Sequence, residues 1–367
     1  MKNKLVAVLD FGSSRISVLV GSKGSNNGFN IMASENVDYA GFMQGKFLLE
    51  GNLFEEIALC LNTAQLKLNE KIDRLFVSVP AEFCFNAIEE LEVDFKIPTK
   101  IKQKQLDLLL EKIEGLEFQD KTLISKAPIE YLINNEKTVF SPIGESITSL
   151  KCKVSEMFVS DYFISLISEI LDNLQINEYN FICPEQVTGS YLLEPDERTN
   201  GAIIVDVGYI TTSIAIAKGE GLTNLKAFSM GGGHITSDLA EVLKINYDSA
   251  EELKRKLILT IRPNAIDTYE LSNGDSINMQ TANEIAFARI DLIIDTIEKC
   301  LKKIGELNNE KPIYLTGGGI SYLKGIKCYL REKLNREIKL IAPAPLQLHK
   351  YELSSAVAVL NIACDFT

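Results

Sequence analysis

The fold is decided by two stretches that share one plan, KLVAVLDFGSSRISVLVGSK (residues 4–23) and GAIIVDVGYITTSIAIAKGEG (residues 201–221). Each begins with an apolar strand that ends near an aspartate, Asp10 or Asp206. A short turn rich in glycine and hydroxyl side chains follows, and then a second strand in which apolar residues alternate. Such alternation is typical of β-strands. The sequence therefore predicts two matching β-hairpins, one in each half of the chain.

Helical patterns lie between and after the hairpins. Apolar residues recur at helical spacing in residues 158–174 and again before Pro312, which predicts two amphipathic core helices. Their stripes are Tyr162, Leu166, Ile170 and Leu174, and Ile290, Ile293, Ile297, Leu301 and Ile304. Residues 311–334 predict a strand, a glycine triplet and a helix with Leu323, Ile326, Leu330 and Leu334 inward. Strands that alternate with helices indicate an α/β fold.

Length and composition indicate a folded protein with more than one large core. The 367 residues are 46% hydrophobic and 24% charged. At about 150 residues per domain this suits two large domains or one bilobed protein. The net charge of −12 disfavours a nucleic-acid partner.

Cysteine usage and hydropathy disfavour several further classes of protein. Seven scattered cysteines without a CxxC pair, and only two histidines, make a disulfide framework or a zinc site unexpected. The N-terminal segment reaches Asp10 too soon for a signal peptide, and no apolar run approaches the roughly 18 residues that span a bilayer. We therefore expect a cytoplasmic protein.

The two aspartates suggest a phosphate site that contains a metal ion. A carboxylate and a phosphate repel unless a cation lies between them, so Asp10 and Asp206 would hold Mg²⁺, mostly through water. The turns would offer backbone N–H groups and the side chains of Ser13, Ser14, Arg15, Thr211 and Thr212, after Gly12 and Gly208. One Asp-Gly turn is common for conformational reasons alone. Two copies in matching strands are a stronger signal.

Two glycine runs extend this interpretation. Gly317, Gly318 and Gly319 lack Cβ atoms, so their backbone could lie against a purine or ribose, although a structural turn competes with that reading. Gly231, Gly232 and Gly233 start a helix whose N–H groups could face phosphate. Farther on, Glu251 and Lys254 are three residues apart, as in an exposed ion pair on one helix face.

In order, LDFGSSR, IVDVGYITT, GGGHITSDLA, AEELK and IYLTGGGISYLKGI resemble the nucleotide-binding signatures of the actin, sugar kinase and chaperone superfamily. Three further segments, residues 41–65, 71–80 and 128–154, make the chain most similar to the FtsA family of bacterial actin homologues. PilM, an actin-like protein of type IV pilus assembly, is the nearest competitor. The resemblance covers nearly the whole chain.

The resemblance implies a two-lobed actin-like ATPase fold with duplicated ribonuclease-H-like cores and an FtsA-type subdomain IC. The implied subdomains are IA (1–80 and 346–367), IC (81–177), IIA (178–230 and 284–345) and IIB (231–283). ATP and Mg²⁺ would lie between the lobes. The two hairpins would bind phosphates, Gly231–Gly233 would lie by the nucleotide, Glu251 and Lys254 by the ribose and base, and Gly317–Gly319 under the adenosine.

The resemblance also implies partners and a location. FtsA-like proteins bind the C-terminal tail of FtsZ through subdomain IIB, self-associate into filaments and work with other division proteins. The implied location is the inner face of the cell membrane near the division site. No basic amphipathic helix follows the pattern LSSAVAVLNIA near the end of this sequence. We therefore expect membrane attachment only through a C-terminal helix outside it or through a partner.

Several residues depart from the family pattern. Tyr209 and Ile210 replace two glycines of the second hairpin, and Ser213 replaces an acid. Cys183 stands where relatives often carry a side chain that orients the attacking water, and the register of Glu185 looks wrong for that role. Added side chains restrict backbone approach to a γ-phosphate. We expect ATP binding to be retained or weakened and hydrolysis to be slow or absent.

Three alternatives stay open from sequence. A PilM-like scaffold would suit the length, although the segment 141–144 favours FtsA. A small-molecule kinase would need a carboxylate base for a substrate hydroxyl, and none is identifiable. A purely structural protein without nucleotide would account for the altered second hairpin.

Overall fold

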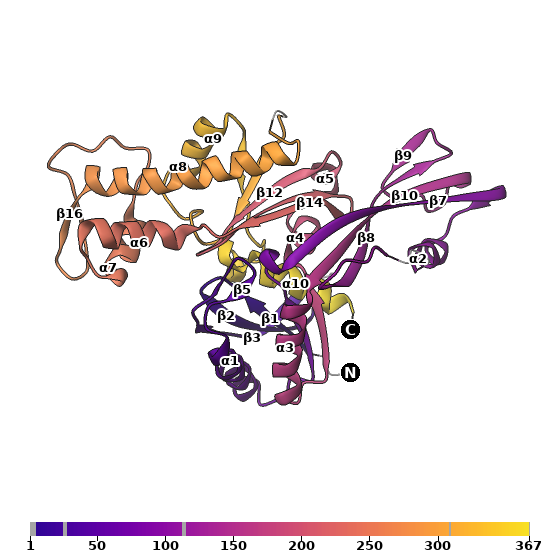
Figure 1. Cartoon of the computed structure of the whole chain (residues 1–367), viewed down its shortest axis with the longest axis horizontal. Coiled ribbons are helices and arrows are strands. Elements are labelled where there is room, and N and C mark those ends of the chain that lie inside the picture. The colour runs from indigo at the N-terminus through magenta and orange to yellow at the C-terminus, as the bar shows by residue number, and fades with distance from the viewer. Residues whose placement is uncertain (1–4, 25–27, 112–114, 308–309, 367) are drawn as a thin grey trace.

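Two five-stranded sheets form the centre of the protein, as seen in a computed structural model that describes residues 5–24, 28–111, 115–307 and 310–366 (Figure 1). Lys4, the first residue of the expected hairpin, lies outside the described residues. The first sheet has the order β11-β6-β1-β2-β3. Its strands are β1 (Leu5–Phe11), β2 (Arg15–Lys23), β3 (Phe29–Asp38), β6 (Arg74–Ser78) and β11 (Glu178–Ile182). The second sheet has the order β14-β13-β12-β17-β18. Its strands are β12 (Ala202–Val207), β13 (Thr212–Lys218), β14 (Gly221–Phe228), β17 (Ile313–Thr316) and β18 (Ile338–Leu340).

The two sheets repeat one topology, which confirms the predicted duplication. In each, three antiparallel strands in chain order are extended by two parallel strands beside the first. Asp10 on β1 lies in register with Ser17 and Ser78. Asp206 on β12 lies in register with Ser213 and Thr316. The aspartates therefore occupy equivalent positions.

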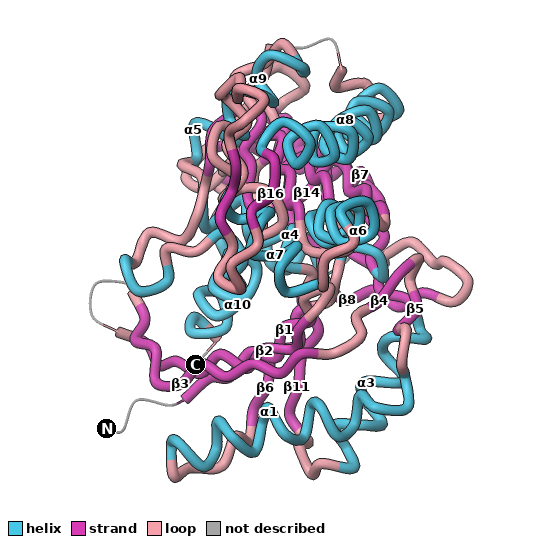
Figure 2. Tube along the Cα trace, turned by 90° about the vertical axis from the view of Figure 1, so that its left-hand side faces the viewer, coloured by secondary structure: helices cyan, strands magenta, loops and turns pink. Residues whose placement is uncertain are grey.

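Helices cover both faces of the first sheet, which explains why β1 is almost continuously apolar. Figure 2 shows α1 (Leu53–Leu68) and α3 (Asp161–Asn173) on one face and α10 (Ser354–Asp365) on the other. The buried side chains of α3 are Phe163, Ile167, Ile170 and Leu171. Ile170 is buried as predicted, whereas the other three residues of the predicted stripe are half-buried. The helix begins at Asp161, and Phe158 belongs to the preceding strand.

The second sheet packs against a larger helical layer, made of α6 (Gly232–Leu243), α7 (Tyr247–Lys256), α8 (Met279–Lys303) and α9 (Ile326–Leu334). Ile290, Ile293, Ile297 and Leu301 of α8 are buried as predicted, whereas Ile304 is half-buried beyond the helix end. All four inward residues predicted around α9 are buried, although Leu323 precedes the helix. The hairpin of β15 (Thr268–Glu270) and β16 (Ser276–Asn278) closes the far end of this layer.

A third sheet projects from the side opposite that hairpin (Figure 1). Its antiparallel strands are β7 (Cys84–Lys100), β10 (Ser146–Ser160), β8 (Lys121–Ile133) and β9 (Lys137–Val139), with α2 (Gln103–Glu111) against its outer part. Asn86 Nδ2 donates to the Leu222 carbonyl at 3.2 Å, which ties β7 to β14.

The remaining elements are α4 (Pro184–Leu192), α5 (Pro195–Arg198), and the strand pair β4 (Phe42–Met43) and β5 (Lys46–Phe47). The subdomain boundaries implied by the resemblance stay predictions.

Two further expectations from sequence concern hydropathy and cysteines. In the described part of the chain, no helix is both long and apolar enough to cross a bilayer. Among the described residues no cysteine forms a disulfide bond, and four of the seven are buried. Those four pack as small core side chains, as expected, whereas Cys328 is exposed.

Candidate functional site

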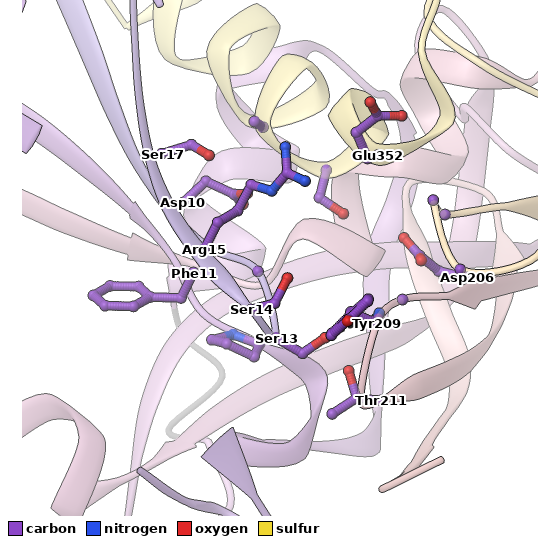
Figure 3. A pocket seen from close by; sticks show the side chains of 18 of the residues that line it. Asp10, Phe11, Ser13, Ser14, Arg15, Ser17, Asp206, Tyr209, Thr211 and Glu352 are labelled. Carbon is purple, nitrogen blue, oxygen red and sulfur yellow. Dashed lines mark hydrogen bonds between the residues drawn. The ribbon is translucent and has the colours of Figure 1, made fainter. Parts of the chain in front are cut away.

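A cavity of about 820 Å³ lies between the two hairpins. Of the residues predicted for the site, fourteen line it: Asp10, Gly12, Ser13, Ser14, Arg15, Asp206, Gly208, Thr211, Thr212, Glu251, Lys254, Gly317, Gly318 and Gly319. Figure 3 shows Asp10 and Asp206 on opposite sides of the cavity, with Arg15 and Glu352 between them. The fold thus brings together groups from both ends of the chain.

The first hairpin places a carboxyl group at the cavity wall. Asp10 is buried at the end of β1, and burial raises its pKa to about 6, partly offset by a hydrogen bond with Ser78. Tyr39 donates from its hydroxyl to the Gly12 carbonyl at 2.8 Å, which fixes the turn from behind. Arg15 is exposed at the cavity rim.

The second hairpin supplies the matching carboxyl group. Burial raises the pKa of Asp206 to about 7, helped by the negative charges of Glu185 and Asp10. Thr212 Oγ1 donates to the Met230 carbonyl at 2.6 Å, so this buried hydroxyl already has a partner inside the protein. Asp206 and Asp10 therefore face the cavity as two equivalent but electrostatically coupled acids.

Glu185 is a third acid at the site, although its register in the sequence looks wrong for a role there. The structure places Glu185 on the cavity wall, where it accepts a hydrogen bond from Cys183 Sγ at 3.2 Å. Burial raises its pKa, and Asp10 adds to the shift. Pro184 starts α4 and sets the direction of this residue. Position along the chain is a poor guide here, because the first turn of α4 decides which side chain faces the cavity.

The donor set fits a magnesium ion held largely through water. Carboxylate oxygens are hard ligands that suit this ion. Asp10, Glu185 and Asp206 share one cavity. Within the described ranges, however, no three acidic, histidine or cysteine side chains lie close enough to bind one ion directly. Asp10 and Asp206 would therefore contact the ion mainly through its waters, as the sequence predicts.

The two hairpins also contact each other directly. Ser13 Oγ accepts hydrogen bonds from the backbone N–H groups of Tyr209 at 3.1 Å and Ile210 at 2.8 Å. The sequence pattern predicts that these N–H groups face phosphate. In the structure a side chain of the opposite lobe occupies them, a contact that we call the Ser13 latch.

Gly231, Gly232 and Gly233 lie beside the cavity and do not line it. Their N–H groups are engaged: Gly231 donates to His234 Nδ1, Gly232 to the Gly208 carbonyl, and Gly233 to the Tyr209 carbonyl. These glycines permit close backbone packing, because a Cβ on Gly232 would lie 2.2 Å from the Gly319 carbonyl oxygen. The structure shows that these glycines serve close backbone packing, and their contact with a nucleotide stays a prediction.

Glu251 and Lys254 form the ion pair that the sequence predicts, but the prediction that this pair is exposed is wrong. Lys254 is buried, with its Nζ 2.7 Å from Glu251 Oε2 and 5.3 Å from the ring centre of Tyr209. Glu251 also accepts from Thr236 Oγ1 at 2.6 Å. The lysine is buried because α6 packs on α7 and the Tyr209 ring covers its ammonium group.

All three residues of the glycine triplet line the cavity, and Gly317 and Gly319 also pack closely against the end of β12. Gly317 has φ +87°, and a Cβ there would lie 2.2 Å from an Asp206 carboxylate oxygen. Gly319 donates to the Val207 carbonyl at 2.7 Å. Gly318 is exposed, and Glu352 lies over it. Glu352 accepts a hydrogen bond from the Tyr322 hydroxyl at 2.6 Å. Tyr322 stands in the segment IYLTGGGISYLKGI, whereas Glu352 stands in no motif that could have revealed it.

Comparisons with known proteins support the resemblance. The family model of cell division protein FtsA matches residues 203–358. A curated cell division protein FtsA of Staphylococcus epidermidis (strain ATCC 12228 / FDA PCI 1200) is 23% identical over 100% of this chain and 80% of its own length.

Two solved structures show the fold. A structure of the PilM–PilN type IV pilus biogenesis complex aligns with TM-score 0.65 and 15% identity, covering 98% of each chain. MreB5 of Spiroplasma citri bound to AMPPNP aligns with TM-score 0.57 and 10% identity, covering 98% of this chain and 96% of that one. The chain therefore has the actin-like ATPase fold that was expected, and its resemblance to FtsA is confirmed.

Proposed function

We propose that this chain is an actin-like adaptor of bacterial cell division that binds ATP and Mg²⁺ in the interlobe cavity and hydrolyses ATP slowly or not at all. The carrying observation is the placement of Asp10 and Asp206 at equivalent ends of two duplicated hairpins that face one cavity. Similarity to FtsA over the whole chain supports the division role. MreB5, which shares the fold, is bound to AMPPNP in its crystal structure, and this supports a nucleotide ligand.

Each part of the cavity has a role in this proposal. The exposed face of Gly318 would receive the adenosine, and the hairpin turns would lie along the phosphates. Arg15 would add a fixed positive charge near them. A bound Mg²⁺ would neutralise phosphate charge, and Asp10 and Asp206 would orient its water shell.

Slow or absent hydrolysis follows from the groups near the phosphate end. The Cys183 thiol is buried, and burial raises its pKa well above the usual value, so it cannot act as a base near neutral pH. Glu185 accepts the hydrogen bond of that thiol. A water attacking the γ-phosphate would therefore find, where relatives often carry the orienting side chain, a thiol that already donates to Glu185.

Calorimetric titration with Mg-ATP tests the site. The Asp side chain in Gly318→Asp would occupy the space proposed for the base and would place a second carboxylate beside Glu352, so this variant should abolish binding. Gly51→Asp is a matched control, since a Cβ at Gly51 has no atom within 4 Å. Unchanged affinity of the Gly318 variant would contradict the site.

The proposed partners follow from the family likeness and from one exposed surface. Residues 231–283 would bind the C-terminal tail of FtsZ, and Val242, Ile261 and Ile266 expose apolar side chains there. We also propose self-association into filaments, contact with other division proteins, and a cytoplasmic location at the inner membrane face near the division site. Membrane attachment would require a C-terminal helix or a partner.

A peptide of the FtsZ tail provides the test of this partner. Ile266 is 88% exposed, and Ile266→Lys should weaken peptide binding by removing apolar contact area. Leu346→Lys is the control, because Leu346 is 91% exposed outside residues 231–283. Equal affinity of the two variants would contradict the placement.

A PilM-like scaffold is the second candidate, favoured by the structural similarity to the PilM–PilN complex. It predicts no affinity for the FtsZ peptide. It predicts binding instead to the cytoplasmic end of an inner-membrane pilus protein. The same titration with both peptides separates the two candidates.

A further inference from the structure

We propose that Ser13 competes with the terminal phosphate of a bound nucleotide, so that the cavity takes a nucleoside diphosphate in preference to a triphosphate. This inference rests on the proposed nucleotide site and names the ligand class that the site selects. The relevant feature is the Ser13 latch, which joins the two hairpin turns across the cavity.

The latch is buried and closely supported. Ser13 is 6% exposed, and its hydroxyl accepts two backbone N–H groups of the opposite hairpin. Gly41 packs behind it with φ +86°, and a Cβ at that position would lie 2.2 Å from the Ser13 carbonyl oxygen. The Ile210 side chain also reaches Gly41. Both lobes therefore hold Ser13 in place.

Tyr209 anchors the other side of the latch. Its ring packs against Gly233, lies 5.3 Å from Lys254 Nζ, and carries a hydroxyl that pairs with the Tyr247 hydroxyl. A glycine in this position could shift its backbone toward a phosphate at little cost. Tyr209 cannot do so without losing these contacts. The turn is thus held in the conformation that the latch requires.

Several other donors near this turn are already engaged. Gly208 donates to the Thr211 carbonyl, Gly232 to the Gly208 carbonyl, and Gly233 to the Tyr209 carbonyl. The Thr212 hydroxyl donates to the Met230 carbonyl. A phosphate that reaches the second turn would therefore meet the Thr211 hydroxyl, and it would gain backbone donors there by taking the N–H groups of Tyr209 and Ile210 from Ser13.

The length of the phosphate chain decides whether this exchange is needed. A nucleotide whose adenosine lies at Gly318 extends its phosphates toward the hairpin turns, and the last phosphate approaches the second turn. A diphosphate ends before the latch and leaves both hydrogen bonds intact. A triphosphate must break them, and it brings additional negative charge toward Asp10, Glu185 and Asp206. The terminal phosphate recovers the two N–H groups that Ser13 loses, so the triphosphate gains no hydrogen bonds over the diphosphate and keeps the added repulsion. We expect an affinity about tenfold lower for the triphosphate.

Calorimetric titration with Mg-ADP and Mg-AMPPNP, an analogue that resists hydrolysis, tests the inference. The expected result for the natural chain is binding of ADP about ten times tighter than binding of AMPPNP. In Ser13→Ala the N–H groups of Tyr209 and Ile210 become available, so AMPPNP affinity should rise about tenfold while ADP affinity changes less than about twofold. Ser190→Ala, an exposed serine on α4, should keep the natural ratio.

The outcomes separate this inference from the proposed function. AMPPNP binding as tight as ADP binding in the natural chain would overturn the inference and leave the nucleotide site intact. The same ratio in the natural chain and in folded Ser13→Ala would also overturn it. Binding of neither nucleotide would refute the proposed site and the inference together. Because the natural chain alone gives a decisive ratio, the test does not depend on the variant folding.

Discussion

Asp10 and Asp206 face the same cavity from equivalent positions of two sheets, and the charge of Asp10 helps to raise the pKa of Asp206. Without a cation between them, two buried acids that share a cavity disfavour each other's ionisation. The duplication therefore creates a site that is electrostatically strained when no ligand is bound. This relationship leads directly to a prediction about pH.

The stability of the ligand-free protein should depend on Asp206 between pH 8 and pH 5. Its folded pKa of about 7 lies above the ordinary value of 3.8, so the folded state binds the proton more tightly than the unfolded state. Its ionisation therefore destabilises the fold fully above pH 7, and this cost decreases progressively as the pH falls from 7 toward 3.8. Asp206→Asn should raise the free energy of unfolding at pH 8 by about 2 to 4 kcal/mol and by less at pH 5.

Urea denaturation with a chelator present measures this effect. Asp73→Asn is the control, because its side chain is exposed and lies outside the cavity. An Asp206 variant with the same pH slope as the natural chain would argue against the coupled acids.

Gly232→Ala should destabilise the protein strongly. Its new Cβ would lie 2.2 Å from the Gly319 carbonyl oxygen, so the backbone of either α6 or the glycine triplet must shift. We expect a loss of about 3 kcal/mol, in the range of overpacked cores. Thermal unfolding of this variant beside Gly51→Ala, where no atom lies within 4 Å, gives the comparison. Equal melting temperatures would show that the two glycine runs, 231–233 and 317–319, are not tightly packed against each other.

Lys254→Met should lower stability through loss of a buried charge pair. Lys254 Nζ lies 2.7 Å from Glu251 Oε2, and removal of the ammonium leaves that carboxylate with Thr236 and Arg255 as partners. The expected loss in free energy of unfolding is about 2 kcal/mol. A matched surface variant, Lys67→Met, removes an exposed lysine from an ion pair and should cost less than about 1 kcal/mol. The reverse order in chemical denaturation would contradict the burial of Lys254.

Removal of magnesium should weaken nucleotide binding. Without the cation, Asp10, Glu185 and Asp206 repel the phosphates directly, so affinity for ADP measured in a chelating buffer should fall at least about tenfold. Titration in calcium-free buffer with and without magnesium checks this result. Equal affinities would mean that the phosphates do not approach the two aspartates.

Phosphate release should stay near the background rate when the protein is incubated with Mg-ATP. The Cys183 thiol is buried and donates to Glu185, so the side chain at position 183 is not free to orient water. A colorimetric phosphate assay over hours provides the measurement. Turnover at the rate of an active ATPase, on the order of 1 per second or faster, would refute the expectation of slow or absent hydrolysis.

The sequence predicted the duplicated hairpins and the core of α8 because these features depend on local periodicity. Ile214 and Ile216 alternate along β13, and Ile290 and Ile297 repeat along one face of α8. The same periodicity wrongly predicts that the helix begins at Phe158, because the apolar spacing continues from β10 into α3. The helix begins at Asp161, after its N-cap residue Ser160.

The residues of the cavity that stand in repeated motifs were predicted from the sequence. The contacts that form only when distant segments fold together were missed. Asp10 and Asp206 stand in repeated motifs, so both could be identified. Glu352 reaches Gly318 from the segment before α10, and Ser13 meets Ile210 across 197 positions of sequence. No pattern within one segment contains such contacts. They depend on how the two sheets pack.

The chain passes between the first and second sheets through α4, and returns after β18 to α10, which packs against α4 and the first sheet. A body that is tied to another at two points turns most easily about the line through those points. We therefore expect the two lobes to rotate relative to each other about an axis through these two connections. A single rotation angle would then describe how far the cavity opens, and a ligand that contacts both hairpins would set that angle for every surface that the lobes carry.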